Sequence, residues 1–385
     1  MARIALNARL LIPGKLEGIG GYIHEICSRW IAACPEDEFL LLFDRKPHPD
    51  FDYGPNAVSR RLLPPARRPV LVDTWFDRAV PRALARWGAD VFVSMEGYLS
   101  RRTDVPQITV IHDLNFEHHP EWVPERWARH YKARFPVYAA LARRVVTVSE
   151  YSRQDLCQTY HLPTARTEVI GNAAGDGFRP FSVAEQAEWR AAKLNGQRYW
   201  LFVGSLHPRK NIGGLLAAFA AYRENGGACQ LVIAGAGLFD RRGEECEATE
   251  GREAEGVVWL GRVSKSHLVG WTAAAEGLLY LPFFEGFGVP IVEAMAAGIP
   301  VVASNVTSIP EVCGGAAAAL LDPRDALGAA RAMLAVEGDA GRRTALAQAG
   351  IQRAAMFDWG QSARQMAALV HQVISTAPND NDRHG

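Results

Sequence analysis

Short apolar runs alternate with segments of helical periodicity along nearly the whole chain of 385 residues. This alternation is typical of βαβ units, in which helices cover both faces of a parallel sheet. The alternation occurs twice, so we expect two Rossmann-like, doubly wound α/β domains. The expected strands are Ile4–Asn7, Phe39–Phe43, Asp90–Ser94, Gln107–His112 and Val145–Ser149, then Trp200–Gly204, Gln230–Gly235, Val257–Gly261, Gly277–Leu281, Pro300–Ser304 and Ala318–Leu321.

A glycine-rich connection between the two halves, which ends at Pro180, marks the expected domain boundary. We predict a first domain of residues 1–175 and a second of residues 176–355. Residues 356–385 are expected to form a helix that packs back on the first domain, followed by a frayed polar tail. Two such domains would face a central cleft, and a ligand should lie there beyond the carboxyl ends of the strands.

Composition excludes several classes of protein. Lys plus Arg number 42 and Asp plus Glu also 42, so no basic excess favours nucleic acid as a partner. The six cysteines form no CxxC pair, so we expect neither a zinc site nor a disulfide framework, and a reducing compartment fits best. The N-terminus resembles a first strand rather than a secretory signal, and no run of about 20 apolar residues could span a bilayer. A cytoplasmic protein is therefore expected.

The segment from Phe284 to Ser304 carries the most chemical information, because it has the pattern of a loop, a helix and a strand. Gly286 and Gly288 allow the backbone to approach a ligand closely, and Pro290 suits a first helical turn. Free amides at such a helix start, together with the helix dipole, favour a phosphate. We therefore expect Gly286, Phe287 and Gly288 to bind the phosphates of a donor.

Two glutamates flank that predicted phosphate site. Glu285 precedes the helix, and Glu293 is expected in its first turn. Carboxylates repel phosphate, so their suitable partners are sugar hydroxyl groups, and a nucleotide sugar has hydroxyls at both ends. The alternative is that Glu293 complements the helix dipole while Glu285 is a solvated loop charge.

Arg209 and Lys210 follow the first strand of the second half, just beyond Gly204. Fixed cations there would stabilise the charge that develops on a departing nucleoside diphosphate, with no need for a metal. The alternative is a pair of solvated charges, although basic residues at a helix start oppose the dipole. We predict Gly204 as part of the same donor site.

Two further elements of the first half are expected to face the ligand. Gly20 and Gly21 lie at a strand-to-helix turn before a helix that begins near Tyr22, although a tight structural turn explains them as well. His112 closes a strand, where its imidazole would orient hydroxyl groups. A hydrogen-bonded core histidine is the alternative.

Glu285 and Glu293, with seven residues between them, resemble the E-x7-E signature of the family-4 glycosyltransferases, which are retaining enzymes of the GT-B fold. The resemblance implies that Glu285 lies against the donor sugar and that Glu293 binds the ribose hydroxyls. It implies that Arg209 and Lys210 bind the pyrophosphate and that His112 contacts the donor sugar. Gly20 and Gly21 would border the donor phosphate and the acceptor.

The resemblance extends over about residues 1–375 and implies a hexosyltransferase that needs no metal or other cofactor. The donor would be a GDP- or UDP-linked sugar, with GDP-mannose preferred because bacterial cell-envelope mannosyltransferases are similar. The acceptor would be a saccharide or a lipid-linked saccharide of surface polysaccharide or lipopolysaccharide. A nucleotide-sugar epimerase or hydrolase of the same fold, or a non-catalytic binding module, are the alternatives.

Three other features receive no catalytic role. Asp50-Phe51-Asp52 is a D-x-D string, but it lies in a proline-rich loop far from the strand ends. His118-His119 lacks the spacing of a helical metal pair. Four arginines bracket Leu62-Leu63-Pro64-Pro65 and could contact the inner membrane peripherally, although a solvated face explains them too; they are Arg60, Arg61, Arg67 and Arg68.

Overall fold

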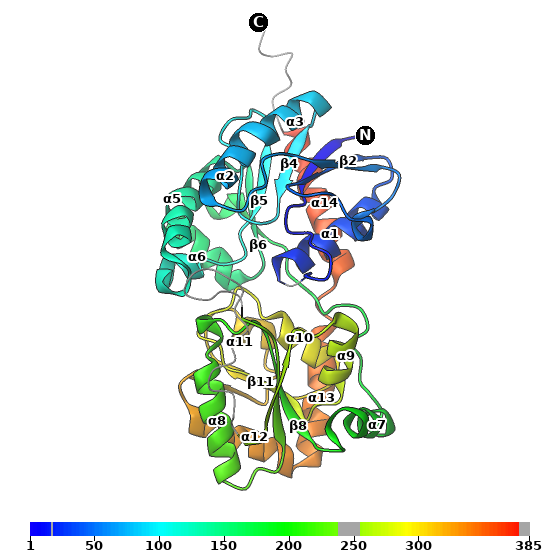
Figure 1. Ribbon diagram of the computed structural model, residues 1–385, viewed down its shortest axis with the longest axis vertical. Coiled ribbons are helices and arrows are strands. Elements are labelled where there is room, and N and C mark those ends of the chain that lie inside the picture. Colours follow the sequence, from blue (N-terminus) through cyan, green and yellow to red (C-terminus); the bar gives the residue numbers. More distant parts are fainter. Residues whose placement is uncertain (17, 238–254, 377–385) are drawn as a thin grey trace, which may run out of the picture. The chain divides into compact units, whose positions relative to one another are not determined.

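The computed structural model describes residues 1–16, 18–237 and 255–376 (Figure 1). The chain divides into two compact units. One contains Met1–Asn172 together with the segment from Trp359 onwards, and the other contains Ala173–Asp358. The first boundary lies three residues before the expected one at residue 175, and the second lies three residues after residue 355.

The first unit is built on a seven-stranded parallel sheet in the order β3-β2-β1-β4-β5-β6-β7. Its strands are β1 (Arg3–Asn7), β2 (Glu38–Phe43), β3 (Ala57–Arg61), β4 (Val91–Ser94), β5 (Gln107–Val110), β6 (Arg144–Thr147) and β7 (Thr167–Val169). Its α-helices are α1 (Ile19–Ala33), α2 (Pro69–Thr74), α3 (Val80–Trp87), α4 (Asn115–His118), α5 (Glu125–Leu141), α6 (Glu150–Tyr160) and α14 (Trp359–Ser375).

The second unit has a six-stranded parallel sheet among its described residues, in the order β10-β9-β8-β11-β12-β13. These strands are β8 (Tyr199–Val203), β9 (Gln230–Ala234), β10 (Val257–Gly261), β11 (Gly277–Tyr280), β12 (Val301–Ser304) and β13 (Ala319–Leu321). The α-helices are α7 (Val183–Leu194), α8 (Ile212–Glu224), α9 (Lys265–Ala273), α10 (Val289–Ala296), α11 (Ile309–Cys313), α12 (Ala326–Gly338) and α13 (Ala340–Ala354).

The predicted fold class is confirmed, and each expected strand coincides with an observed one to within a few residues. Two strands were not predicted. Both lie at edges of the first sheet: β3 has one half-buried residue followed by four exposed ones, and β7 has only three residues. Neither carries the continuous apolar run of a strand that is buried on both faces.

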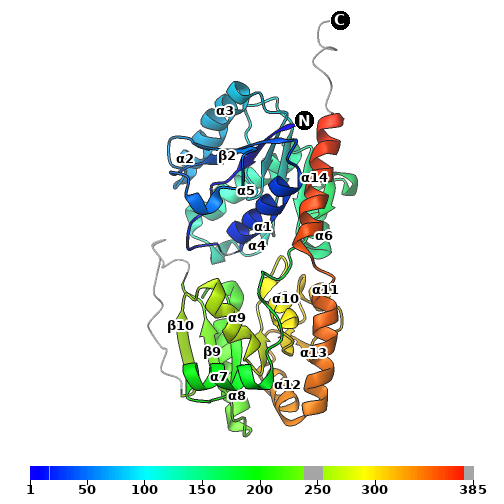
Figure 2. The same cartoon turned by 90° about the vertical axis from the view of Figure 1, so that its right-hand side faces the viewer.

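The C-terminal helix α14 packs against α1 within the first unit, as Figure 2 shows. Ser362 donates a hydrogen bond of 2.9 Å to the carbonyl of Gly171. The ring of Trp359 contacts that of Tyr22 edge-on, with centroids 5.8 Å apart. The chain therefore leaves the first unit near residue 172 and returns to it at residue 359.

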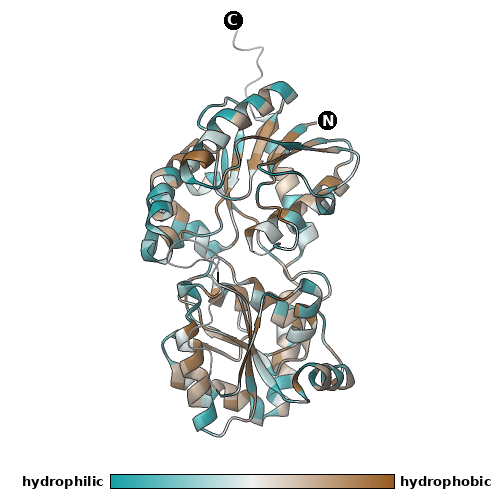
Figure 3. Cartoon of the chain, viewed as in Figure 1, coloured by the Kyte–Doolittle hydropathy of each residue, from teal (hydrophilic) through white to brown (hydrophobic). Residues whose placement is uncertain are grey.

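Apolar side chains concentrate on the strands and on the helix faces that cover them, and the outer helix faces are largely hydrophilic (Figure 3). Strands β4 and β12 are buried along their whole length, which agrees with sheets covered on both faces. No helix among the described residues has the length and apolar character needed to cross a membrane.

Candidate active site

The site in the second unit lies at the carboxyl ends of β8 and β11. These neighbouring strands are where the strand order reverses, because β9 and β10 extend to one side of β8 while β12 and β13 extend beyond β11. In open α/β sheets, ligands bind at this topological switch point. The chain after β8 forms a short turn, Pro208–Lys210, and the chain after β11 leads to Glu285.

A buried ion cluster joins these two connections. Lys210 Nζ donates to Glu285 Oε1, and Arg209 Nη1 lies 2.8 Å from the same oxygen. The hydroxyl of Tyr280 donates to it as well, at 3.0 Å. The side chains of Glu285 and Lys210 are only 8% and 7% exposed, so the alternatives of a solvated loop glutamate and a solvated lysine are wrong. The structure thus brings three of the predicted catalytic residues into contact.

The charges of the cluster fix the protonation of Glu285. Burial acts to raise its pKa, but the adjacent Arg209 and Lys210 outweigh this effect and lower the pKa to about 2. Burial also raises the pKa of the Tyr280 hydroxyl, so this group stays protonated and remains a donor. The carboxylate of Glu285 thus lies between two cationic side chains at the carboxyl end of β8.

Side chains from the loop between β12 and α11 hold the backbone at Glu285. Thr307 Oγ1 accepts from the Glu285 amide at 3.2 Å, and Ser308 Oγ donates to the Glu285 carbonyl at 2.9 Å. Ser308 Oγ also contacts the carbonyl of Phe287 at 3.2 Å. The segment that carries Glu285 precedes α10, whose N-cap Gly288 has a φ of 97°, a conformation that favours glycine.

Glu293 is the fifth residue of α10, so the expectation that it lies in the first turn is wrong by one residue. Its side chain is half-buried, and its charge acts on the Tyr280 hydroxyl. It therefore lies within electrostatic range of the ion cluster. The helix begins at Val289, with Pro290 in its first turn as predicted.

The position of Arg209 and Lys210 depends on Asn211, which sequence reasoning missed. Asn211 adopts a φ of 55°, and its Oδ1 accepts from the amide of Gly214 to cap α8. Its Nδ2 donates to the carbonyls of Leu281 and Pro323 at 2.9 and 2.7 Å. This residue therefore links the chain after β8 to the chain after β11, and an asparagine just before a helix was the signal available in the sequence.

Gly204 ends β8 at a close approach of two backbones. A Cβ atom on the neighbouring Gly235 would lie 1.8 Å from the Gly204 carbonyl oxygen. Gly204 also donates to the carbonyl of Ala234 at 3.0 Å. The sheet thus requires glycine at position 235, and a φ of 151° favours glycine at position 204, whatever part Gly204 takes in binding a donor.

His112 in the first unit follows β5 and is half-buried. Its Nε2 lies 2.9 Å from the carbonyl of Met95, an acceptor, so Nε2 carries the proton and Nδ1 is left as an acceptor. Burial lowers the pKa of His112, which keeps the ring neutral near pH 7. Tyr22 contacts the ring edge-on, with centroids 5.0 Å apart.

Gly20 and Gly21 lie in the first turn of α1, which begins at Ile19, three residues earlier than expected. A Cβ atom at Gly20 would lie 2.7 Å from the backbone oxygen of Leu10. Packing alone therefore requires glycine at position 20, which agrees with the alternative that these glycines serve a tight structural turn. A role of either glycine beside a ligand stays a prediction.

One group among the described residues has three potential metal ligands close together: Cys34, Glu36 and Asp37, between α1 and β2. Both carboxylate oxygens of Asp37 are already used, by the amide of Ala2 at 2.8 Å and by His371 Nε2 at 2.7 Å. Burial, with the nearby carboxylates, raises the pKa of the Cys34 thiol. We therefore attribute this group to the attachment of α14 and the N-terminus.

Comparisons with known proteins agree with this geometry. Residues 197–339 match the family described as "Glycosyl transferases group 1", and residues 17–174 match "Glycosyltransferase Family 4". The O-antigen chain mannosyltransferase B of Escherichia coli is 32% identical over 367 residues, which are 90% of this chain and 94% of that protein.

Solved structures with much lower identity share the fold. Sucrose-phosphate synthase of Thermosynechococcus elongatus superposes with a TM-score of 0.77 at 21% identity, over 98% of this chain and 100% of that one. HepE of Anabaena, in complex with UDP-glucose, superposes with a TM-score of 0.75 at 17% identity, over 97% and 100% of the two chains.

The lowered pKa of Glu285 predicts a pH-dependent loss of stability in Glu285→Gln. A carboxyl group with a lowered pKa stabilises the fold at pH values above its ordinary pKa of 4.5. This contribution is lost as the pH falls from 4.5 towards 2. At pH 7 we expect the substitution to cost about 3 kcal/mol, because it leaves Lys210 buried without its countercharge. Urea unfolding, with hydrogen exchange in the strands of the second unit, measures this cost.

Glu188→Gln is the control, because Glu188 is an exposed glutamate of the same unit. It should change the free energy of unfolding little at any pH. The difference between wild type and Glu285→Gln should shrink steadily below pH 4.5. A cost that stays constant down to pH 2 would mean that packing, rather than charge, causes it.

Proposed function

The chain belongs to the family-4 glycosyltransferases of the GT-B fold, and from this we propose that it transfers mannose from a nucleoside-diphosphate sugar to an acceptor hydroxyl with retention at the anomeric carbon. Similarity to the O-antigen chain mannosyltransferase B over nearly its whole length supports a role in O-antigen or related surface polysaccharide synthesis. The single observation that carries the proposal is the buried cluster of Arg209, Lys210 and Glu285.

Arg209 and Lys210 are proposed to bind the diphosphate of the donor. When the bond between the anomeric carbon and the phosphate oxygen breaks, negative charge develops on the leaving nucleoside diphosphate. Two fixed cations with low exposure stabilise that charge without reorganising, and one such interaction contributes about 3 kcal/mol to the transition state. Their pairing with Glu285 holds them in place before the donor arrives.

Glu285 is proposed to position these cations and the donor sugar, and not to act as a nucleophile or as a general acid. A carboxylate with a pKa of about 2 has no proton to donate near pH 7, and its Oε1 is already occupied by three donors. Front-face transfer needs neither role. The acceptor oxygen bonds to the anomeric carbon as the phosphate oxygen departs. The departing phosphate oxygen receives the proton of the acceptor hydroxyl.

His112 is proposed to orient a hydroxyl group of the donor sugar. Its neutral ring offers Nδ1 as an acceptor because Nε2–H is directed to the Met95 carbonyl. Glu293 is proposed to accept hydrogen bonds from the ribose hydroxyls. The remaining donor-binding residues would be Gly20, Gly21, Gly204, Gly286, Phe287 and Gly288.

GDP-mannose is the preferred donor because the O-antigen chain mannosyltransferase B, which is similar over 90% of this chain, is a mannosyltransferase. A UDP-linked sugar is the competing donor, since HepE was solved with UDP-glucose. Thermal stabilisation by a panel of nucleotide sugars distinguishes them, because a ligand of the folded state raises apparent stability. The acceptor would be a saccharide or a lipid-linked saccharide.

An epimerase or hydrolase, or a binding module without turnover, would use the same donor site. Acceptor dependence separates these functions from a transferase. A hydrolase releases free sugar with no acceptor, an epimerase converts the donor alone, and a binding module gives no product at all. A transferase forms a glycoside only when an acceptor is present.

We expect Arg209→Ala to lower kcat about 100-fold by removing one leaving-group donor. Glu293→Ala should instead chiefly raise the apparent KM for the donor, by about tenfold. Steady-state kinetics with purified donor and a soluble acceptor measure both effects. Arg223→Ala, a substitution on α8 away from the cluster, is the control. Wild-type kinetics in both site variants would refute the assignment of the donor site.

Transfer is proposed to be independent of metal, because Arg209 and Lys210 supply the positive charge that a divalent cation would otherwise provide. The rate of the wild-type enzyme should therefore stay the same, within twofold, after dialysis against EDTA. Restoration of a lost rate by added Mg²⁺ or Mn²⁺ would contradict this.

A cytoplasmic enzyme that contacts the inner membrane peripherally is proposed from one exposed surface of the first unit. Val58, Leu63 and Val70 are 54%, 62% and 75% exposed. The arginines around them are exposed as well: Arg60, Arg61, Arg67 and Arg68. Apolar side chains among cations favour the interface of an anionic bilayer.

This surface predicts that Leu63→Ser/Val70→Ser weakens binding to phosphatidylglycerol vesicles about tenfold, because less apolar area is buried in the interface. Vesicle flotation at 0.1 and 0.5 M salt measures the effect and its charge dependence. Leu327→Ser, which changes an exposed leucine of the second unit, should bind as wild type does. Equal binding by all three proteins would exclude this surface as the contact.

A further inference from the structure

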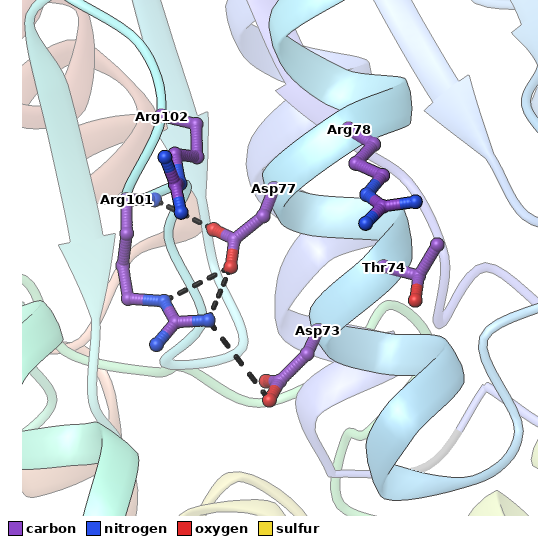
Figure 4. Close-up of a pocket in the computed structure, with 6 residues that line it drawn as sticks. All are labelled: Asp73, Thr74, Asp77, Arg78, Arg101 and Arg102. Atoms are coloured by element: carbon purple, nitrogen blue, oxygen red, sulfur yellow. Dashed lines mark hydrogen bonds and ion pairs between the residues drawn. The ribbon is translucent and has the colours of Figure 1, made fainter.

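A cavity of about 480 Å³ opens in the first unit at an irregular turn of helix (Figure 4). Residues Pro69–Trp87 are helical throughout, but the turn Trp75–Ala79 between α2 and α3 is a π-helix. Such turns occur frequently at functional sites. The opposite wall comes from the loop between β4 and β5, and the lining residues are Asp73, Thr74, Asp77, Arg78, Arg101 and Arg102.

Both aspartates of the cavity are held by arginines. Asp77 accepts from the backbone amide of Arg101 at 2.8 Å and from its Nε at 3.0 Å. Asp73 accepts from Arg134 Nη2 at 2.7 Å. The carboxylates are therefore neutralised within the protein and do not repel an anion from the cavity.

The guanidinium groups of Arg78 and Arg102 have no hydrogen-bond or ion-pair partner among the residues that the structure describes. In the view of Figure 4 they flank Asp77, with Arg78 on the helix and Arg102 on the loop. Both residues are exposed and line the same cavity. With Asp73 and Asp77 already paired, these arginines give the cavity an uncompensated positive charge.

Two buried polar groups on α5 lie behind the same ion pairs. His130 Nε2 is 3.9 Å from Asp73 Oδ1 and makes no hydrogen bond, and its side chain is 7% exposed. The hydroxyl of Tyr138 is fully buried and, like His130 Nε2, has no hydrogen-bond partner within residues 1–16, 18–237 and 255–376. It lies within electrostatic range of Asp73, Asp77 and Arg101. Buried polar groups without a hydrogen-bond partner are rare in proteins and often accompany a bound water or ion.

The cavity is distinct from the residues proposed to bind the donor. Ser100, next to Arg101, donates its amide to the side chain of Gln107, the first residue of β5. His112 follows the other, carboxyl end of that strand. The cavity therefore lies near the opposite end of β5 from His112.

We propose that this cavity binds the phosphate group of an anionic ligand through Arg78 and Arg102. Two planar guanidinium groups match the non-bridging oxygens of a phosphate in a bidentate arrangement, and their positive charge complements its negative charge. A free phosphorylated compound and a lipid headgroup both present non-bridging phosphate oxygens, so the chemistry of the cavity fits either source. This inference goes beyond sugar transfer and does not depend on the donor site.

Inorganic pyrophosphate and vesicles test the two sources on the full chain. Pyrophosphate is titrated while the Nε–Hε resonances of the arginines are followed by NMR, so that Arg78 and Arg102 are observed separately from Arg209. Flotation with phosphatidylglycerol or phosphatidylcholine vesicles tests the headgroup. The variant is Arg78→Gln/Arg102→Gln. Its control, Arg82→Gln/Arg86→Gln, removes the same charge from exposed positions of α3 outside the cavity.

In the wild type we expect pyrophosphate to shift the Arg78, Arg101 and Arg102 resonances to saturation. In the variant, followed through the remaining Arg101 resonance, pyrophosphate should bind at least about tenfold more weakly, with the control within twofold of wild type. If only binding to phosphatidylglycerol depends on Arg78 and Arg102 beyond the control, the proposal holds with a lipid headgroup as the source. Equal weakening by both pairs of substitutions, or no effect with either probe, would overturn it. Unchanged Arg209 shifts in the variant show that the donor site is intact.

Discussion

The interaction on which the second unit depends is the contact of Arg209 and Lys210 with one buried oxygen of Glu285. Burying three charged groups is costly, and a buried ion pair alone is weak evidence for stability. Its value here is positional, because Glu285 fixes two cations at the ends of β8 and β11 where the strand order reverses. The arrangement keeps two cations at the position where an α/β sheet binds its ligand.

Uncharged groups make this arrangement possible. Asn211 bonds to carbonyls beyond β11 and beyond β13, and Ser308 bonds to the backbone at Glu285. These contacts fix the backbone on both sides of the ion cluster, so the cations need no rearrangement when charge develops. Preorganisation of this kind contributes more to catalysis than the number of charges alone.

Much of this architecture could be predicted from the sequence, because parallel strands buried on both faces leave continuous apolar runs. Arg209, Lys210 and Glu285 could be found because they follow such strands. Strand β3 could not, since its residues are mostly exposed. The hydrogen bond that Tyr280 donates to Glu285 depends on a contact across the loop, and the cavity beside Arg78 depends on a π turn that carries no periodic signal.

The account rests on the claim that Arg209 and Lys210 bind the diphosphate of the donor. Comparing the dissociation constants of a nucleoside diphosphate and of its nucleoside, in wild type and in Arg209→Ala, tests this claim most directly. We expect the substitution to weaken binding of the nucleoside diphosphate at least about tenfold and to leave binding of the nucleoside unchanged. If the substitution weakened binding of both ligands equally, or weakened binding of neither, Arg209 would not bind the diphosphate.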